Sequence, residues 1–238
     1  MRRRTRSSSM LSIIVPTLNE AETIVPTLAS LQKSRGRDAE IIVVDGGSTD
    51  ATLALARPFC DQIKSARRGR ASQMNAGAAL ALGDVLLFLH SDTRLPDGAT
   101  ELVRSAFLRG NRVWGRFDVR IESRHPVLWL VGHMMNLRSR WTGIATGDQA
   151  MFVRRSNFEA LGGFPDIPLM EDIALSGALR RLSWPICVST PAITSARRWE
   201  RRGVISTILL MWRLRLAYFL GTDPADLAIE YGYAPRDT

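Results

Sequence analysis

Short apolar segments alternate with segments of helical periodicity between residues 11 and 90, and few folds accommodate that order. The strand-like segments are LSIIVP (11–16), EIIVVD (40–45), the weaker DQIKSA (61–66) and DVLLFLH (84–90). Helical spacing or helix-capping residues mark 20–33, 48–56 and 71–82. Strands that alternate with helices predict a parallel sheet with right-handed crossovers. Because the strands are almost continuously apolar, helices are expected on both faces of the sheet.

The second half of the chain is less regular but continues the same class of fold. Strands are expected at 113–122, 148–155 and 185–190, and helices at 126–141, 171–182 and 203–221. The sequence contains no internal repeat and no linker rich in proline or glycine. We therefore expect a single α/β domain with a Rossmann-like mixed, mainly parallel sheet flanked by helices.

The composition of the chain limits its partners. Apolar residues make up 45% of the 238 residues, which is enough for a sizeable core. The formal net charge of +9 favours anionic partners such as nucleic acid, phosphorylated small molecules or an anionic membrane. An arginine-rich, solvated surface explains the charge equally well. Basic residues interleaved with aromatic ones are missing, so no nucleic-acid partner is expected.

The N-terminal segment and the cysteines bear on location. Residues 1–9 are basic and are predicted to form a disordered tail. The apolar run after them is too short for a signal-peptide core, and no run of about 18 apolar residues predicts a membrane span. Cys60 and Cys187 lie far apart and form no zinc or disulfide pattern, as is typical of a reducing compartment. We expect a cytoplasmic location, with the inner face of the cell membrane as an alternative.

Two common phosphate-binding motifs are absent from the sequence. The loop after the first strand, TLNEAET, contains no glycine, so the dinucleotide-binding fingerprint is missing. The P-loop motif is missing as well. An anionic ligand must then be held by other means, and a divalent cation bound to a carboxylate is the obvious one.

Carboxylates follow two of the predicted parallel strands, Asp45 after the second and Asp92 after the fourth. The carboxyl ends of parallel strands meet at one edge of a sheet, so both side chains can face one crevice. Glu171 and Asp172 open a predicted helix and form a third cluster. Turn and helix-cap chemistry explains each acid singly, and a strand-end hydrogen bond explains His90. One shared site explains the set better than separate caps do.

Several longer patterns occur in a fixed order along residues 11–182. They are SIIVPTLNEAETI, EIIVVDGGSTDAT, GRASQMNAGAALALGDVLLFLHSDT, GDQAMFVRR with LGGFPD, and MEDIALSGALRRL. With these motifs the sequence resembles the family-2 glycosyltransferases of the GT-A fold. Within that family it is most similar to the radical-SAM/selenodomain-associated transferase 2 branch. The resemblance implies transfer of a sugar, with inversion, from a nucleoside diphosphate donor to an acceptor hydroxyl, with a UDP-sugar as the first candidate donor.

The resemblance also implies roles for individual residues. Positions around the donor nucleotide and sugar are matched by Pro16, Thr17, Asn19, Glu20, Asp45, Arg70, Asn75, His90, Ser91, Arg198 and Trp199. Asp92 matches the last acid of the family's DxD element, which binds Mg²⁺ or Mn²⁺ and through it the diphosphate. Asp172 matches the general base that removes the acceptor proton, and Glu171 stands beside it.

Two positions depart from the family pattern. The DxD element reads His90-Ser91-Asp92, so its first acid is missing. A metal would then depend on Asp92 together with diphosphate oxygens, and His90 would touch the donor instead. Ser195 stands where the QxxRW element of processive members has glutamine, although the arginine and tryptophan of that element are retained. A long polymer product is therefore not expected.

The apolar segment 203–221 has three explanations. A helix lying in a membrane interface would place Arg213 and Arg215 at lipid headgroups and would suit a lipid-linked acceptor rather than a small molecule. The alternatives are packing against a second subunit, as in a homodimer, or against the rest of the domain. Burial is the expectation, because apolar helices of globular domains usually lie against a core.

The expected organisation is one GT-A domain spanning 10–238. Within it we expect a nucleotide-binding half at 10–95, an acceptor-binding half at 96–202, and a C-terminal apolar helix and tail at 203–238. The main alternative function is a non-catalytic nucleotide-sugar-binding or assembly protein of the same fold, in which loss of the first DxD acid abolished transfer. The three acids that remain at the predicted site argue for the enzyme.

Overall fold

The computed structural model describes residues 10–108 and 110–233, so the tail predicted at 1–9 lies outside the described residues. The strands are β1 (Leu11–Thr17), β2 (Ala39–Asp45), β3 (Gln62–Ser65), β4 (Val85–Phe88), β5 (Thr93–Arg94), β6 (Trp114–Glu122), β7 (Phe152–Arg154) and β8 (Ile186–Ser195). They form one eight-stranded sheet in the order β3-β2-β1-β4-β7-β6-β8-β5. The first four strands are parallel, whereas β7 is antiparallel to both β4 and β6. The predicted mixed, mainly parallel sheet is confirmed.

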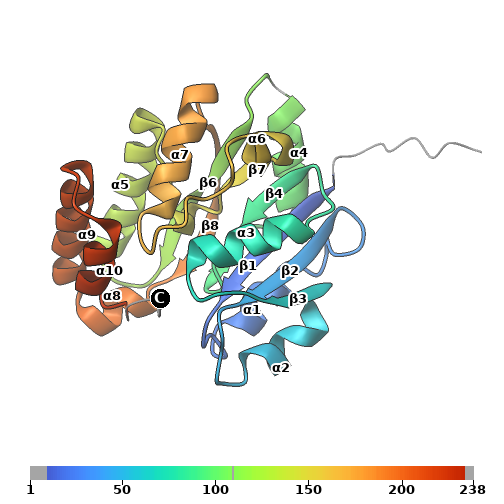
Figure 1. Cartoon of the computed structure of the whole chain (residues 1–238), viewed down its shortest axis with the longest axis horizontal. Helices are drawn as coiled ribbons and strands as arrows, with labels where there is room; N and C mark the ends of the chain where they lie inside the picture. Colours follow the sequence, from blue (N-terminus) through green and yellow to red (C-terminus); the bar gives the residue numbers. More distant parts are fainter. Residues whose placement is uncertain (1–9, 109, 234–238) are drawn as a thin grey trace, which may run out of the picture.

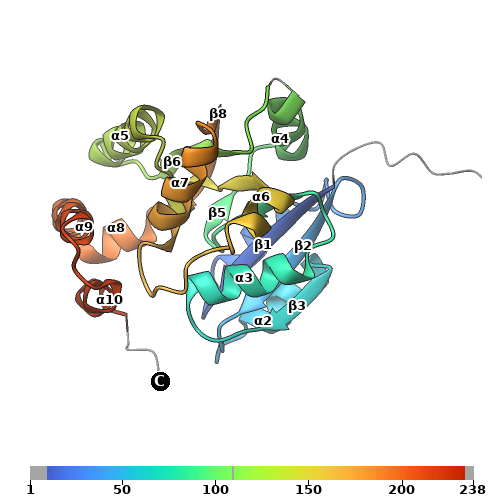
Figure 2. The same ribbon diagram turned by 45° about the horizontal axis from the view of Figure 1, so that its top comes forward.

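Helices cover both faces of this sheet, as the apolar strands predicted (Figure 1). They are α1 (Ile24–Ala29), α2 (Thr52–Ala56), α3 (Arg70–Leu80), α4 (Ala99–Leu108), α5 (Pro126–Thr142), α6 (Arg155–Ala160), α7 (Glu171–Leu182), α8 (Arg197–Arg202), α9 (Val204–Phe219) and α10 (Pro224–Tyr231). Short 3₁₀ turns occur at Arg57–Phe59 and Gly147–Gln149. Figures 1 and 2 show α5, α8, α9 and α10 gathered beyond β6 and β8, on the side away from α2.

Two apolar layers form because successive residues of a strand point to opposite faces. Ile13 and Val15 of β1 join the layer that contains residues of α1, α2 and α4. Ile14, between them, joins the layer that contains residues of α3, α6 and α7. All seven residues of β1 and all seven of β2 are buried, so these strands are held from both sides.

The helix α3 approaches the sheet closely because its residues are small. A Cβ built at Gly77 would lie 2.5 Å from Cγ2 of Ile14 and 2.9 Å from Cγ2 of Val44. Only a glycine lets the two backbones come this near without displacing the strands. The close approach fixes where the N-terminus of α3 stands against the edge of the sheet.

The helix α9 is buried on one side only. Thr207 and Leu214 are its buried residues, and Leu214 belongs to a cluster with Leu227 and Tyr231 of α10. The opposite side exposes Ile205, Leu209, Trp212, Leu216 and Phe219, each by at least 61% of its surface. The expectation that this apolar face packs on the rest of the domain is therefore wrong for the described chain. The reason is that α10 and the loop before α7 cover only one stripe of the helix. A membrane interface or a second subunit stays a prediction for the exposed side.

The described helices include none with both the length and the apolar character needed to cross a membrane.

Candidate functional site

A pocket opens where the parallel strands β1 and β4 end. It is lined by Pro16, Thr17, Leu18, Glu20, Arg68, Gly69, Arg70, Gln73, His90, Ser91, Asp92, Pro168, Arg198 and Tyr233. The residues among these that the sequence predicted are Pro16, Thr17, Glu20, Arg70, His90, Ser91, Asp92 and Arg198. The fold thus gathers segments far apart in the chain at one edge of the sheet, as expected for an open α/β fold.

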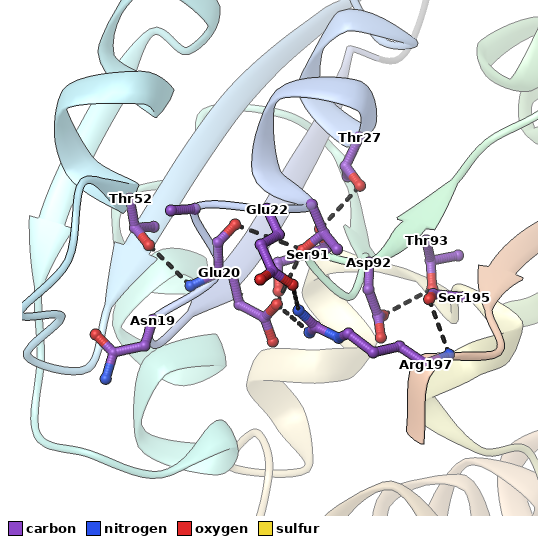
Figure 3. Close-up of polar contacts among 12 residues, drawn as sticks. Asn19, Glu20, Glu22, Thr27, Thr52, Ser91, Asp92, Thr93, Ser195 and Arg197 are labelled. Atoms are coloured by element: carbon purple, nitrogen blue, oxygen red, sulfur yellow. Dashed lines mark hydrogen bonds and ion pairs between the residues drawn. The ribbon is translucent and has the colours of Figure 1, made fainter. Parts of the chain in front are cut away.

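Arg197, at the start of α8, lies beside Asp92 and was not predicted from the sequence (Figure 3). Its guanidinium donates hydrogen bonds to Glu20 and, at 3.3 Å, to Glu22. The N–H of Ser195 donates to the carbonyl oxygen of Asp92 at 3.1 Å, which ties β8 to the loop after β4. Burial acts to lower the pKa of Arg197, but the hydrogen bond and charge of Glu20 raise it above its usual range. A fixed positive charge therefore stands next to the predicted metal ligand.

His90 forms a rigid wall of the pocket. Its Nδ1 lies 3.2 Å from Oδ1 of Asp148. Burial acts to raise the pKa of Asp148, but the hydrogen bond and charge of His90 hold it well below its usual range. The carboxylate is therefore an acceptor only, and Nδ1 of His90 is the donor. On the other edge of the ring, a Cβ at Gly147 would lie 2.2 Å from Nε2, so the chain needs glycine there.

Glu171 and Asp172 begin α7, as predicted. Met170 before them has φ of +69°, in the left-handed region that residues with a side chain adopt at a cost. The carboxylate of Asp172 accepts hydrogen bonds from the N–H of Gly147 at 2.8 Å and from the N–H of the next residue at 2.7 Å. Both acids line a small cavity that shares His90 with the main pocket. Asp172 is therefore held in one orientation next to the predicted donor site.

The carboxyl group of Glu171 changes charge near neutral pH. Glu171 is 3% exposed, and its Oε1 lies 3.9 Å from Nη1 of Arg70. Burial and then the charge of Asp172 raise the pKa of Glu171 to about 7, against the opposing charge of Arg70. Perturbed carboxyl groups of this kind concentrate at functional sites.

Four residues predicted at the donor lie outside the pocket lining. Asn19 accepts from the N–H of residue 49, and Asp45 accepts from the N–H groups of residues 47 and 48, so both shape loops. Asn75 exchanges two hydrogen bonds with the backbone of Phe164 and ties α3 to the loop before α7. Trp199 packs against the apolar cluster of β6 and α5. Their contact with a donor stays a prediction.

Other pocket residues could not be found from the sequence. The amide of Gln73 donates to the carbonyl oxygens of Thr17 and Val44, each at 2.8 Å, and so holds the ends of β1 and β2 together. Tyr233, which follows α10, reaches the pocket from the far end of the chain, and its ring lies 6.0 Å from the guanidinium carbon of Arg70. Nothing in the periodicity of the chain brings these positions together.

The side chains around Asp92 suit a metal ion only if a bound ligand supplies further oxygen atoms to it. Within the described ranges 10–108 and 110–233, no cluster of three or more His, Cys, Asp or Glu side chains could hold a metal ion. A single carboxylate is sufficient where substrate phosphates and water complete the coordination shell of Mg²⁺. Arg197 beside Asp92 disfavours a second cation unless a diphosphate brings negative charge. The residues therefore fit a metal that arrives with a phosphorylated ligand.

A mixed sheet of this order, with one pocket at the edge where its parallel strands end, defines an α/β protein of the GT-A fold class. The family model described as "Glycosyl transferase family 2" matches residues 12–162, and the chain belongs to this family. The similarity to the radical-SAM/selenodomain-associated branch stays a prediction.

Named relatives and solved structures agree with this class. The PGL/p-HBAD biosynthesis glycosyltransferase of Mycobacterium bovis is 32% identical over 177 residues, which cover 66% of this chain and 64% of that protein. The chain thus spans just under two thirds of the length of that relative. The mannosyltransferase PcManGT of Pyrobaculum calidifontis, solved with GDP-Man and Mn²⁺, aligns with a TM-score of 0.63 at 24% identity, over 97% of this chain and 67% of its own. Glucosyl-3-phosphoglycerate synthase of Mycobacterium tuberculosis, solved with Mg²⁺ and UDP, gives a TM-score of 0.56 at 22% identity, over 79% and 70%.

Proposed function

We propose that this protein transfers a sugar from a nucleoside diphosphate sugar to an acceptor hydroxyl, with inversion at the anomeric carbon. One observation carries the proposal. The pocket that contains Asp92 and the small cavity that contains Asp172 share the side chain of His90 as a wall. Asp92 and Asp172 therefore lie on either side of one residue, so an acceptor that reaches Asp172 would stand near a diphosphate at Asp92, and such proximity is itself a large part of catalysis.

The donor would lie along the pocket, with the nucleoside near Pro16, Thr17 and Glu20 and the phosphates near Arg70 and Arg198. Guanidinium N–H groups match phosphate oxygens in geometry and charge. Burial acts to lower the pKa of Arg70, but the nearby tyrosine and carboxyl groups raise it, so this cation is permanent. The GDP-Man and UDP bound to the two related structures support a nucleotide-linked donor, and UDP-sugars are the first to test.

Mg²⁺ or Mn²⁺ would be held by Asp92 and would stabilise the negative charge that develops on the leaving diphosphate. The Mn²⁺ of the mannosyltransferase and the Mg²⁺ of the synthase support this assignment.

Asp172 would act as the general base in a single displacement. Its carboxylate accepts the proton of the acceptor hydroxyl while the acceptor oxygen forms a bond to the anomeric carbon. The bond from that carbon to the diphosphate oxygen breaks, and its electron pair leaves with the nucleoside diphosphate. The N–H groups of Gly147 and Ile173 hold the two carboxylate oxygens of Asp172 and orient it for this step. Attack opposite the leaving group inverts the anomeric configuration.

Calorimetric titration of UDP, GDP, dTDP and CMP, each with and without Mn²⁺, tests the donor site. We expect one nucleoside diphosphate to bind, and binding to weaken without Mn²⁺ or in Asp92→Asn. Asp97→Asn is the matched control, because Asp97 lies on the surface and pairs with Lys33. Failure of every nucleotide to bind folded protein would remove the proposal.

A turnover assay distinguishes the transferase from the alternative, a protein that binds nucleotide sugars without catalysis. Release of nucleoside diphosphate from the donor that binds should fall by about 10²–10⁴-fold in Asp172→Asn, with donor affinity unchanged. Glu159→Gln on α6, whose carboxylate is exposed and pairs with Arg155, should keep the wild-type rate. Equal rates in wild type and Asp172→Asn would favour the binding protein.

A further inference from the structure

Two arginines whose charges interact with Asp172 make no side-chain hydrogen bond or salt bridge to any described residue. Arg138 lies on α5 and Arg215 on α9, and both side chains are half-buried. The Nε and Nη2 atoms of Arg138 are buried and make no hydrogen bond within the described parts of the chain. No hydrogen bond or ion pair joins Arg215 to residues of the same ranges. Buried cationic groups normally find such a partner, because an unpaired charge costs stability.

A neighbouring arginine on α5, by contrast, has its guanidinium hydrogen-bonded to a carboxylate. Arg140, two residues after Arg138, donates to both carboxylate oxygens of Asp118 at 2.6 and 2.9 Å. Arg116 of β6 donates to the same carboxylate and, at 3.1 Å, to Ser139. Arg140 and Arg138 lie on the same helix, yet of the two only Arg140 is paired with a described residue. The lack of a hydrogen-bond partner is therefore specific to the surroundings of Arg138.

The charges of Arg138 and Arg215 act on each other and on the acids of the site. Burial first, and then the charge of Arg215, lower the pKa of Arg138 to about 10, while Asp172 and Asp148 oppose the shift. Burial likewise lowers the pKa of Arg215, again against Asp172 and Asp148. Two positive charges that repel one another, and that no described carboxylate neutralises by a salt bridge, would be stabilised by a bound anion.

We propose that Arg138 and Arg215 together bind an anionic group of the acceptor, a phosphate or phosphate-like oxyanion, next to Asp172. The proposal rests on the proposed transferase function and deepens it, since it names the chemical class of the acceptor. Paired guanidinium forks from two helices match the oxygens of such a group. An acceptor held there by its anionic group would place a nearby hydroxyl at the carboxylate of Asp172.

The phosphate could belong to a soluble small molecule or to a lipid headgroup. The exposed apolar side of α9, including Leu209, Trp212 and Leu216, lies on the same helix as Arg215. Helices α5 and α9 carry arginines and no acidic residue, which suits a surface that approaches anionic lipid. The chemistry at the two arginines is the same in both cases, so the source is decided by experiment.

The test uses inorganic phosphate as the probe on the wild-type chain and on its variants Arg138→Met and Arg215→Met. Each substitution should weaken phosphate binding by about tenfold or more, because each removes charge-assisted hydrogen bonds. Arg213→Met is the matched control, since Arg213 lies two residues from Arg215 on the same helix, is exposed and pairs with Glu230. It should bind phosphate as wild type does. Arg70→Met separates this site from phosphate bound in the donor pocket.

Thermal unfolding distinguishes a ligand site from a structural role. Removal of an unpaired buried cation should leave the melting temperature of Arg138→Met and Arg215→Met unchanged or raise it. Phosphate should raise the melting temperature of wild type and Arg213→Met but not that of the two variants. Lower melting temperatures together with unchanged phosphate binding would overturn the proposal, as would phosphate binding that depends on Arg70 alone.

Nucleotide titration on the same variants separates the two proposals. Donor affinity should be unchanged in Arg138→Met and Arg215→Met, so a protein that binds phosphate through these arginines but binds no nucleotide would refute only the transferase. Binding to phosphatidylcholine vesicles with and without phosphatidic acid shows whether the bound phosphate belongs to a lipid or to a soluble molecule. Loss of binding to the anionic vesicles in both variants supports a lipid phosphate, and loss of inorganic phosphate binding alone supports a soluble acceptor.

Discussion

The sheet half of the molecule and its C-terminal helices are built on different principles, although both reach the same pocket. Every residue of β1 and β2 is buried, and helices pack on both faces. In α9, by contrast, only Thr207 and Leu214 are buried. The sheet therefore forms a well-packed support for the proposed donor site, while the C-terminal helices contribute charged and aromatic side chains from a thinly packed layer. The side proposed to bind the acceptor is thus the side that packing constrains least.

Two leucines with the same burial test this contrast most strongly. Leu86 of β4 and Leu214 of α9 are both 0% exposed. We expect Leu86→Ala to lower the free energy of global unfolding by about 2–5 kcal/mol, because it opens a cavity in the sheet core. Leu214→Ala should instead speed hydrogen exchange mainly within α9 and α10, as expected for a separately opening unit. Denaturant unfolding and native-state hydrogen exchange measure the two effects. Equal exchange changes in β1 after both substitutions would show that the halves unfold as one.

The second prediction concerns Glu171, the first residue of α7, and the pH dependence of the protein's stability. Its pKa is raised in the folded state to about 7 from an ordinary value of 4.5, so the folded protein binds more protons than the unfolded chain between these values. Stability should therefore fall as pH rises from about 4.5 to about 7, by an amount on the order of 2 kcal/mol. Glu171→Gln should abolish this decline and be the more stable protein at pH 7. A parallel pH profile for both proteins would show that Glu171 is not the group responsible.

A pair of glycine substitutions compares a helix face in tight contact with the sheet and a helix face that has room for a methyl group. Gly77→Ala in α3 places a methyl group 2.5 Å from Ile14 and should cost about 1–3 kcal/mol. Gly177→Ala in α7 meets its nearest neighbour, Ile144, at 3.9 Å, so the helix propensity of alanine should stabilise the protein by about 0.5–1 kcal/mol. Chemical denaturation gives both values. The same sign for the two substitutions would contradict the difference in packing.

The smallest effect is expected on the exposed side of α9. Trp212 is 69% exposed, so Trp212→Ala should change the unfolding free energy by less than about 0.5 kcal/mol. The measurement is repeated at several protein concentrations, because a face buried between two copies would give a larger, concentration-dependent loss. Such a loss would assign this side of the helix to a dimer.

Much of the fold was predictable from local pattern. The alternation of apolar and helical segments placed β1, β2 and α7 within a residue or two, because a strand or helix carries its own periodicity. The same placement brought Asp92 to the edge of the sheet, since parallel strands end together. The predicted helix at 203–221 is found as α9, whereas the short helices α8 and α10 on either side of it were not predicted, because segments of six and eight residues carry little periodicity.

The sequence by itself determined the class of fold, the strands that carry the pocket and the acids that could serve it. Only the tertiary structure decided which charges are paired. Arg197 meets Glu20 across 177 positions of chain, His90 meets Asp148 across 58, and the buried Nε and Nη2 of Arg138 find no hydrogen-bond partner among the described residues. It also decided that one side of α9 stays uncovered. The physical reason is that periodicity reports which face of an element is apolar, whereas pairing and burial depend on what the rest of the chain brings against that face.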